Sequence, residues 1–144
     1  GFLCQDVDEK MDFEEKYRLV HIGYDNAYAK YSHFQVGALV ILKDGNYVIG
    51  SNVENASFGL SNCAERTALF ATYAKGYRKD DIEELVIMGK SDNLIFPCGA
   101  CRQVISELMN KDALVTLINL DKKTKSFTVE ELLPYAFAES DLNE

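Results

Sequence analysis

The sequence predicts an α/β protein folded as a three-layer α/β/α sandwich. Apolar stretches of strand length alternate with segments of helical periodicity along most of the chain, and such alternation is typical of a sheet covered by helices. The turn Asp44-Gly45 separates two stretches rich in Val, Ile and Leu, which predicts an antiparallel hairpin. At 144 residues the chain is long enough for one domain with a sizeable core.

The first half of the chain is expected to hold one helix and this hairpin. Apolar residues recur at intervals of three and four from Asp12 to about Ala29, which predicts an amphipathic helix. The two arms of the hairpin are Phe34 to Leu42 and Tyr47 to Val53.

The second half is expected to alternate helices with buried strands. A helix is predicted from Cys63 to about Lys75, with Gly76 as its stop signal. The remaining elements are a strand over Leu85 to Met88, a helix from Cys98 to about Met109, a strand over Ala113 to Leu120, and a short helix over Val129 to Leu133 before Pro134.

Composition favours a small soluble enzyme of a reducing cytoplasm. The net charge of −8 argues against nucleic acid as a partner, and no apolar run approaches the length of a membrane helix. No segment resembles a secretory signal, and four cysteines in such a chain indicate metal or thiol chemistry. The acidic segment 1–11 is patternless and starts without Met, which suggests a processed or introduced end, so the domain is expected to span residues 12–144.

The most informative motif is Cys63-Ala64-Glu65 together with Pro97-Cys98-Gly99-Ala100-Cys101. Three thiolates at this spacing can hold one zinc ion and leave its fourth position open for water. A carboxylate two residues after the first thiolate can then act on that water without being a ligand. The motif therefore predicts a hydrolytic zinc site.

Two other interpretations of the cysteines remain open at this point. A thioredoxin-like Cys-x-x-Cys couple would leave Cys63 and Glu65 without a role. A closed structural zinc site would need a fourth ligand, for which Cys4, His21 and His33 are the candidates.

The N-termini of two predicted helices are expected to stabilise the thiolates of this site. Cys63 is predicted at the N-terminus of one helix, and Cys98 and Cys101 in the first turn of another, where the positive end of the helix dipole favours thiolates. Three thiolates leave a zinc site with a net negative charge, which hydrogen bonds from Arg66, and less clearly Arg102, would offset. Surface ion pairing is the alternative for both arginines.

Together with further motifs, these residues resemble the small homotetrameric cytidine deaminases of the three-cysteine zinc type. The segments that carry the resemblance are Cys63–Ala68, Pro97–Gln103, Tyr28–Ala38, Asn52–Ala56 and Glu130–Pro134, and together they span most of the chain. The resemblance implies a mixed sheet of about five strands and one zinc ion per subunit, bound by Cys63, Cys98 and Cys101. It also implies hydrolytic deamination of cytidine and 2′-deoxycytidine in pyrimidine salvage, with ammonia release and with Glu65 moving the protons.

The resemblance also assigns residues to the nucleoside. It implies that Asn52 and Glu54 hold the ribose 3′-hydroxyl, that Phe34 packs on the base, and that the amide of Ala64 contacts the base. Phe137 would close the site of a neighbouring subunit, which implies a homotetramer with shared active sites. Plain alternatives are a polar pair at a strand edge for Asn52 and Glu54, and core packing for Phe34.

Two positions depart from the family pattern. Phe58 stands where many relatives have tyrosine, and Tyr135 where glycine is common, so details of affinity are in question.

Two other functions are alternatives to this one. A deaminase of another small aminated heterocycle, such as blasticidin S, shares the zinc motifs but does not explain Asn52 and Glu54. A non-catalytic zinc-stabilised module would leave Glu65 without a role.

Overall fold

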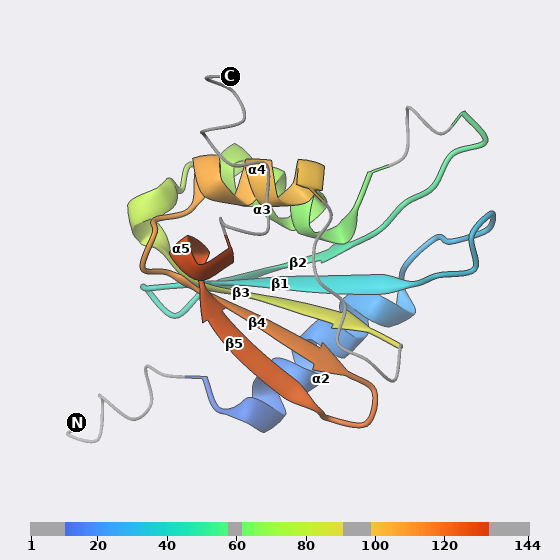
Figure 1. Cartoon of the computed structure of the whole chain (residues 1–144), viewed down its shortest axis with the longest axis horizontal. Coiled ribbons are helices and arrows are strands. Elements are labelled where there is room, and N and C mark those ends of the chain that lie inside the picture. Colours follow the sequence, from blue (N-terminus) through green and yellow to red (C-terminus); the bar gives the residue numbers. More distant parts are fainter. Residues whose placement is uncertain (1–10, 58–61, 91–98, 133–144) are drawn as a thin grey trace.

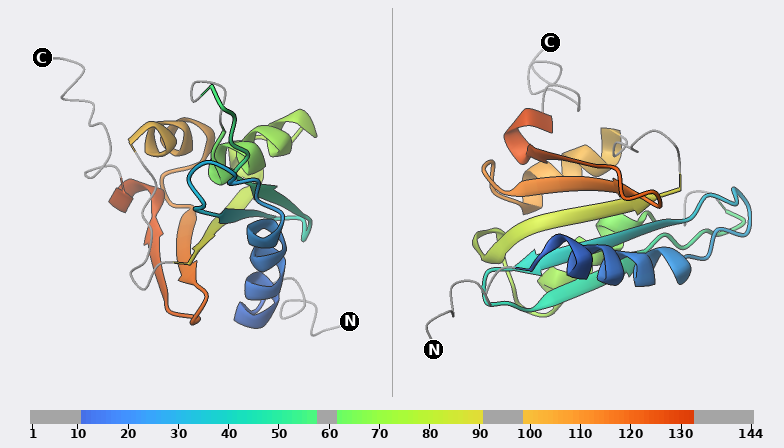
Figure 2. Two further views of the ribbon diagram at one scale, coloured as in Figure 1. Left: turned by 90° about the vertical axis from the view of Figure 1, so that its right-hand side faces the viewer. Right: turned by 90° about the horizontal axis from the view of Figure 1, so that it is seen from below.

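The computed structural model describes residues 11–57, 62–90 and 99–132. Five strands form one mixed sheet in the order β2-β1-β3-β4-β5. Helix α2 covers one face of the sheet, and α3, α4 and α5 cover the other (Figures 1 and 2). The three-layer α/β/α sandwich and the five-stranded mixed sheet predicted from the sequence are thereby confirmed.

Pairing in the sheet is antiparallel except between β3 and β4. The hairpin of β1 and β2 is antiparallel, β1 pairs antiparallel with β3, β3 pairs parallel with β4, and β4 pairs antiparallel with β5. The strands are β1 (Val36–Leu42), β2 (Tyr47–Ser51), β3 (Ile82–Gly89), β4 (Leu114–Asn119) and β5 (Thr124–Thr128).

The helices largely occupy the predicted positions. They are α2 (Phe13–Asp25), α3 (Ala64–Ala74), α4 (Gly99–Leu108) and α5 (Val129–Leu132), with a 3₁₀ turn η2 (Lys79–Asp81) before β3. Gly76 follows the end of α3 with a φ of +100°, a backbone conformation that suits glycine and confirms its role as the stop.

The first helix ends earlier than the sequence predicted. Its N-terminus is capped by Asp12, whose side chain accepts a hydrogen bond from the Glu15 N–H at 2.9 Å. It ends at Asp25 rather than near Ala29. The Tyr28 N–H donates to the Asn52 carbonyl at 2.9 Å instead, so these backbone groups pair with a distant segment and leave the helix.

Strand β5 had no predicted position of its own. Three of its five residues are exposed, and it lies at an edge of the sheet. A short polar edge strand lacks the apolar alternation by which strands are recognised.

Each face of the sheet has its own apolar core. Leu19, Val20 and Tyr24 of α2 pack against alternate residues of β1 and β3 on one face. The other face packs against α3, α4 and α5, including Leu69 and Ile105. Strand β1 is buried on both faces, which is typical of a strand with a continuous apolar run.

The N-terminal boundary of the domain stays a prediction. Met11 packs at the edge of the α2 core, and Asp12 caps α2. The segment before them falls outside the described residues. Within the described part of the chain, no helix is long and apolar enough to cross a membrane.

Helix α3 lies directly against β2 at Gly50. A Cβ added there would lie 2.7 Å from the Ala64 carbonyl oxygen, 2.7 Å from the Ala68 nitrogen and 2.8 Å from the Ala68 Cβ. Such distances are below van der Waals contact, and two of the atoms belong to the backbone of α3. Any side chain at position 50 therefore has to push the start of α3 away from the sheet.

We expect Gly50→Ala to lower the free energy of unfolding by about 3 kcal/mol or more, because overpacking against backbone cannot be relieved by a rotamer change. Gly45→Ala is the comparison: Gly45 has open space but a φ of +93°, so its cost is only the backbone term of about 1 kcal/mol. Urea unfolding of both variants measures the difference. A larger loss in Gly45→Ala than in Gly50→Ala would contradict the close approach.

Candidate metal centre

The sheet order brings the N-termini of α3 and α4 to the same end of the sheet, beyond the carboxyl ends of β2 and β3. Strand β1 is antiparallel to both β2 and β3, so β2 and β3 run in the same direction. Helix α3 follows β2, and α4 follows β3. Both helices therefore begin beyond the carboxyl ends of their strands, on the same face of the sheet (Figure 1).

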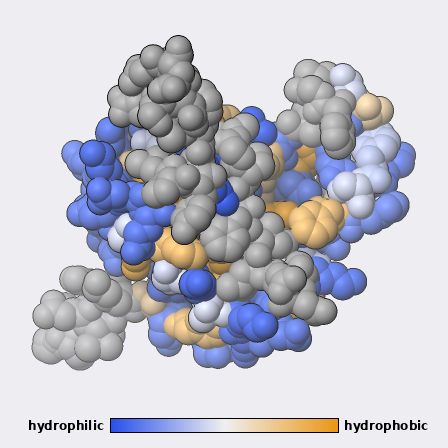
Figure 3. Space-filling model, in the orientation of Figure 1, coloured by the Kyte–Doolittle hydropathy of each residue, from blue (hydrophilic) through white to orange (hydrophobic). Residues whose placement is uncertain are grey.

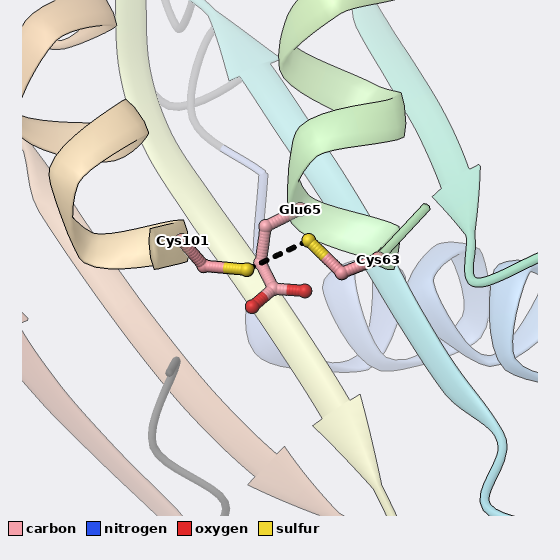
Figure 4. A group of neighbouring side chains, drawn as sticks. All are labelled: Cys63, Glu65 and Cys101. Carbon is pink, nitrogen blue, oxygen red and sulfur yellow. Dashed lines mark hydrogen bonds between the residues drawn. The ribbon is translucent and has the colours of Figure 1, made fainter. Parts of the chain in front are cut away.

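Three side chains from these helix starts point toward one another (Figure 4). Cys63 is the N-cap residue of α3, Glu65 lies in its first turn, and Cys101 lies in the first turn of α4. The sulfurs of Cys63 and Cys101 are 2.7 Å apart. One ligand atom from each of the three residues lies within 4.8 Å of the others.

Burial and neighbouring charges shift the pKa values of these groups in opposite directions. The hydrogen bond with Cys101 lowers the pKa of the Cys63 thiol to about 5, and the Arg66 Nε–H, 3.1 Å from its sulfur, contributes to the lowering. Burial raises the pKa of Glu65 to about 7, and the charge of Cys63 adds to the rise. A thiol that ionises easily thus lies beside a buried carboxyl group, and a divalent cation would balance negative charge on both.

The donor chemistry fits zinc. Two thiol sulfurs and a carboxylate oxygen are present, and thiolates favour zinc over the hard cations magnesium and calcium. Arg66 donates a hydrogen bond to the Cys63 sulfur. This contact was predicted above from the net negative charge of a zinc site with three thiolates. Cys98, the predicted third sulfur, lies outside the described residues.

A closed site built on a histidine finds no support in the described part of the chain. His21 lies on α2 and bonds Asp25 at 3.0 Å. His33 lies in the loop before β1. Neither belongs to the donor group that contains Cys63 and Cys101, and Cys4 lies outside the described residues.

A cavity of about 260 Å³ opens beside the donor group. Its described lining includes Asn52, Glu54 and Ala64, together with Cys63 and Glu65. The structure therefore brings three of the predicted nucleoside contacts to the predicted metal site. A larger hollow of about 1060 Å³ lies over α2 and the hairpin, but no group of metal-binding side chains lies there among the described residues.

Asn52 and Phe34 are linked to each other at the start of β1. The Asn52 Oδ1 accepts from the Val36 N–H at 2.9 Å, and its Nδ2 donates to the Phe34 carbonyl at 2.9 Å. Asn52 is buried, whereas Phe34 is 44% exposed and is not part of the described cavity lining. Phe137, Phe58 and Tyr135 lie outside the described residues, so their predicted roles stay predictions.

Sequence reasoning missed two polar residues near the site. The Thr67 hydroxyl donates to the Cys63 carbonyl at 2.9 Å and accepts from Asn62 at 3.0 Å, which ties the segment before α3 to its first turn. The Ser32 hydroxyl donates to the Glu54 carboxylate. Ser32 belongs to a motif quoted above, but a partner 22 positions away cannot be inferred from spacing within that motif.

Comparison with known proteins gives a consistent set of matches. The family model described as the cytidine and deoxycytidylate deaminase zinc-binding region matches residues 13–117. A cytidine deaminase of Halalkalibacterium halodurans is 48% identical over 120 residues, covering 83% of this chain and 89% of the relative. One of Sporosarcina psychrophila is 39% identical over 133 residues, covering 92% and 96%.

Solved structures agree with the sequence relatives. The 1.6 Å crystal structure of cytidine deaminase from Burkholderia pseudomallei superposes with a TM-score of 0.84 at 42% identity, covering 88% of this chain and all of that one. The crystal structure of cytidine deaminase from Mycobacterium tuberculosis gives a TM-score of 0.72 at 31% identity, covering 90% and 99%. The matched family region is zinc-binding, so the metal indicated by the donor chemistry is zinc.

We expect Cys101→Ala to lower zinc affinity by more than about 100-fold, because protein zinc sites owe roughly 10 to 16 kcal/mol to about four ligands and each sulfur carries several of these. Competition with a chromogenic chelator measures the affinity. Cys4→Ala is the matched control and should leave it unchanged. Equal zinc affinity in Cys101→Ala and the parent would remove Cys101 from the site.

Proposed function

The chain belongs to the cytidine and deoxycytidylate deaminase family, and from this premise we propose that it hydrolyses cytidine and 2′-deoxycytidine to uridine and 2′-deoxyuridine, releasing ammonia. The observation that carries the proposal is the buried Glu65 carboxylate beside the sulfurs of Cys63 and Cys101, at the wall of a cavity that also contains Asn52 and Glu54. A nucleoside with an exocyclic amine suits a cavity with both a hydrolytic and a hydroxyl-binding part.

Cys63, Cys98 and Cys101 would hold the zinc ion in this proposal, which leaves Glu65 free for proton transfer. When bound, zinc makes water acidic enough to supply a nucleophile near neutral pH. The hydrogen bond from Arg66 to the Cys63 sulfur supports this arrangement, because it offsets negative charge that would otherwise weaken the effect.

Glu65 carries the protons. Its carboxylate takes a proton from the attacking water and passes it to N3 of the pyrimidine, so that C4 accepts the oxygen. The proton of the hydroxyl now on C4 then goes through Glu65 to the amine at C4. The C4–N bond breaks as the C4 carbonyl forms, and ammonia leaves. The burial that raises the pKa of Glu65 to about 7 suits a group that has to accept and release protons near neutral pH.

Asn52 and Glu54 would hold the ribose 3′-hydroxyl, and the Ala64 amide would contact the base. All three line the cavity. The Asn52 amide accepts from the Val36 N–H and donates to the Phe34 carbonyl. Among contacts within the described residues this leaves one acceptor position and one donor for a ligand. Phe34 would pack on the base.

The setting proposed for this activity is pyrimidine salvage in the cytoplasm, by a homotetramer in which Phe137 of one subunit closes the site of another. Support for assembly comes from apolar side chains on the segments beside the site: Tyr28, Tyr31, Phe34 and Val53 are each between 44% and 50% exposed. Figure 3 shows apolar patches interrupting a largely hydrophilic surface.

We expect Glu65→Gln to retain zinc and to lose at least about 10³-fold in kcat, because the amide cannot accept the proton that the reaction moves. Ammonia release from cytidine by zinc-quantified protein measures the loss. Glu107→Gln, which alters an exposed carboxylate on α4, should retain full turnover. Normal turnover in Glu65→Gln would contradict the proposed mechanism. Zinc binding by a parent that is inactive on cytidine would favour another heterocycle or a structural role.

Removal of the metal should abolish ammonia release, and added zinc should restore it where added magnesium does not. Thiolate ligands bind zinc in preference to hard cations. Loss of the ion should also lower the midpoint of thermal unfolding, because it links α3 to α4 and binds only the folded chain. Activity that survives complete chelation, verified by metal analysis, would exclude zinc from the reaction.

A further inference from the structure

Two segments beside the cavity form an arm that extends past the end of the sheet, residues 26–35 and 52–57 (Figures 1 and 2). Their backbones pair near the sheet: the Tyr28 N–H donates to the Asn52 carbonyl, and the Glu54 N–H donates to the Tyr28 carbonyl, both at 2.9 Å. Past this point the contacts between the segments involve the Glu54 side chain. Glu54 therefore connects the two halves of the arm.

The Glu54 carboxylate accepts three hydrogen bonds from the other segment. Its Oε1 accepts from the N–H groups of Tyr31 at 3.1 Å and Ser32 at 2.9 Å. Its Oε2 accepts from the Ser32 hydroxyl. The same hydroxyl oxygen accepts from the Phe34 N–H at 3.0 Å. Ser32 thus contacts both the carboxylate proposed to hold the ribose and the residue proposed to pack on the base.

The Glu54 carboxylate has few hydrogen-bond acceptor positions left for a ligand. An ionised carboxylate offers about four acceptor positions, and the loop occupies three of them. Hydrogen bonds from Ser32 also lower the pKa of Glu54, which keeps the group ionised and acceptor-only at neutral pH. A ligand that meets it in the cavity has to bring a donor, such as a sugar hydroxyl.

The loop between the two contact residues is held in an unfavourable conformation. His33 has a φ of +60°, which is uncommon for a residue with a side chain. The His33 N–H donates to the Ala29 carbonyl at 2.8 Å, and Ser32 and Phe34 on either side are fixed by the contacts above. The hydrogen bonds of Ser32 therefore help to select this loop shape over more relaxed ones.

We propose that Ser32 is a positioning residue for the sugar-binding half of the site, whose hydroxyl fixes the Glu54 carboxylate so that its free acceptor position faces the ligand, and sets Phe34 beside it. This inference rests on the proposed function. It adds a residue that is not part of the described cavity lining, and it gives the discrimination between sugars a physical origin in the preorganisation of one carboxylate.

The test compares cytidine with 3′-deoxycytidine as substrates of Ser32→Ala, Ser32→Thr and the parent. In Ser32→Ala we expect KM for cytidine to rise about tenfold, as for the loss of one hydrogen bond to a charged group. We expect kcat to stay within about twofold and zinc content to be unchanged. The preference for cytidine over 3′-deoxycytidine, expressed as a ratio of kcat/KM values, should shrink by a similar factor.

Ser32→Thr retains the hydroxyl at an exposed position and should restore both KM and the preference to within about twofold of the parent. Ser57→Ala is the control on the same arm, because Ser57 contributes its backbone N–H, at 3.0 Å from Asn55 Oδ1, to the structure there. It should leave KM and the preference unchanged.

Three results would overturn the assignment while leaving the proposed function intact. A lower KM in Ser32→Ala would mean that the hydroxyl competes with the sugar. A loss of kcat and zinc together would mean general damage to the fold. An unchanged preference between the two substrates would separate Ser32 from the sugar. A parent that releases no ammonia from cytidine would instead contradict the proposed function itself, and the assignment with it.

Discussion

A carboxylate and two sulfurs, each of which can carry a negative charge, share one small and largely buried space, and this constraint organises the rest of the site. Glu65 is only 6% exposed and Cys101 only 1%, so water cannot stabilise their ionised forms. Positive potential has to come from the protein and its metal. The starts of two helices, the Arg66 guanidinium and a divalent ion are the available sources.

The sheet order is what makes that arrangement possible. Because β1 lies between β2 and β3 and opposes both, two β–helix connections begin at the same edge without their strands being neighbours. Each connection contributes part of the donor group: Cys63 and Glu65 from α3, and Cys101 from α4. A sheet with β3 reversed would place the start of α4 at the opposite edge.

Local patterns predicted most of the fold and singled out the Cys63, Glu65 and Cys101 side chains that the structure brings together, whereas long-range polar contacts could not be predicted. The spacing of cysteines around Cys63 and Cys101 predicts metal ligands, and Asp44-Gly45 predicts a turn. Each prediction needs only a few consecutive residues of the sequence. The early end of α2 depends on backbone pairing of Tyr28 with a distant segment, and strand β5 on pairing with β4. The residues of either segment alone do not indicate the distant segment with which it pairs.

The contact of α3 with β2 determines which half of the metal centre can adapt to ions of different radius. Ala64 and Ala68 lie against Gly50 with almost no side chain between the backbones, so the helix that carries Cys63 and Glu65 has no softer position to move into. Ile105 of α4 and Met109, just after its end, belong to the apolar core on that face through longer side chains, and methionine in particular can change rotamer at little cost. Adjustment of the sulfur positions is therefore expected mainly at Cys101, while Cys63 and Glu65 keep a fixed relation to the cavity that they line.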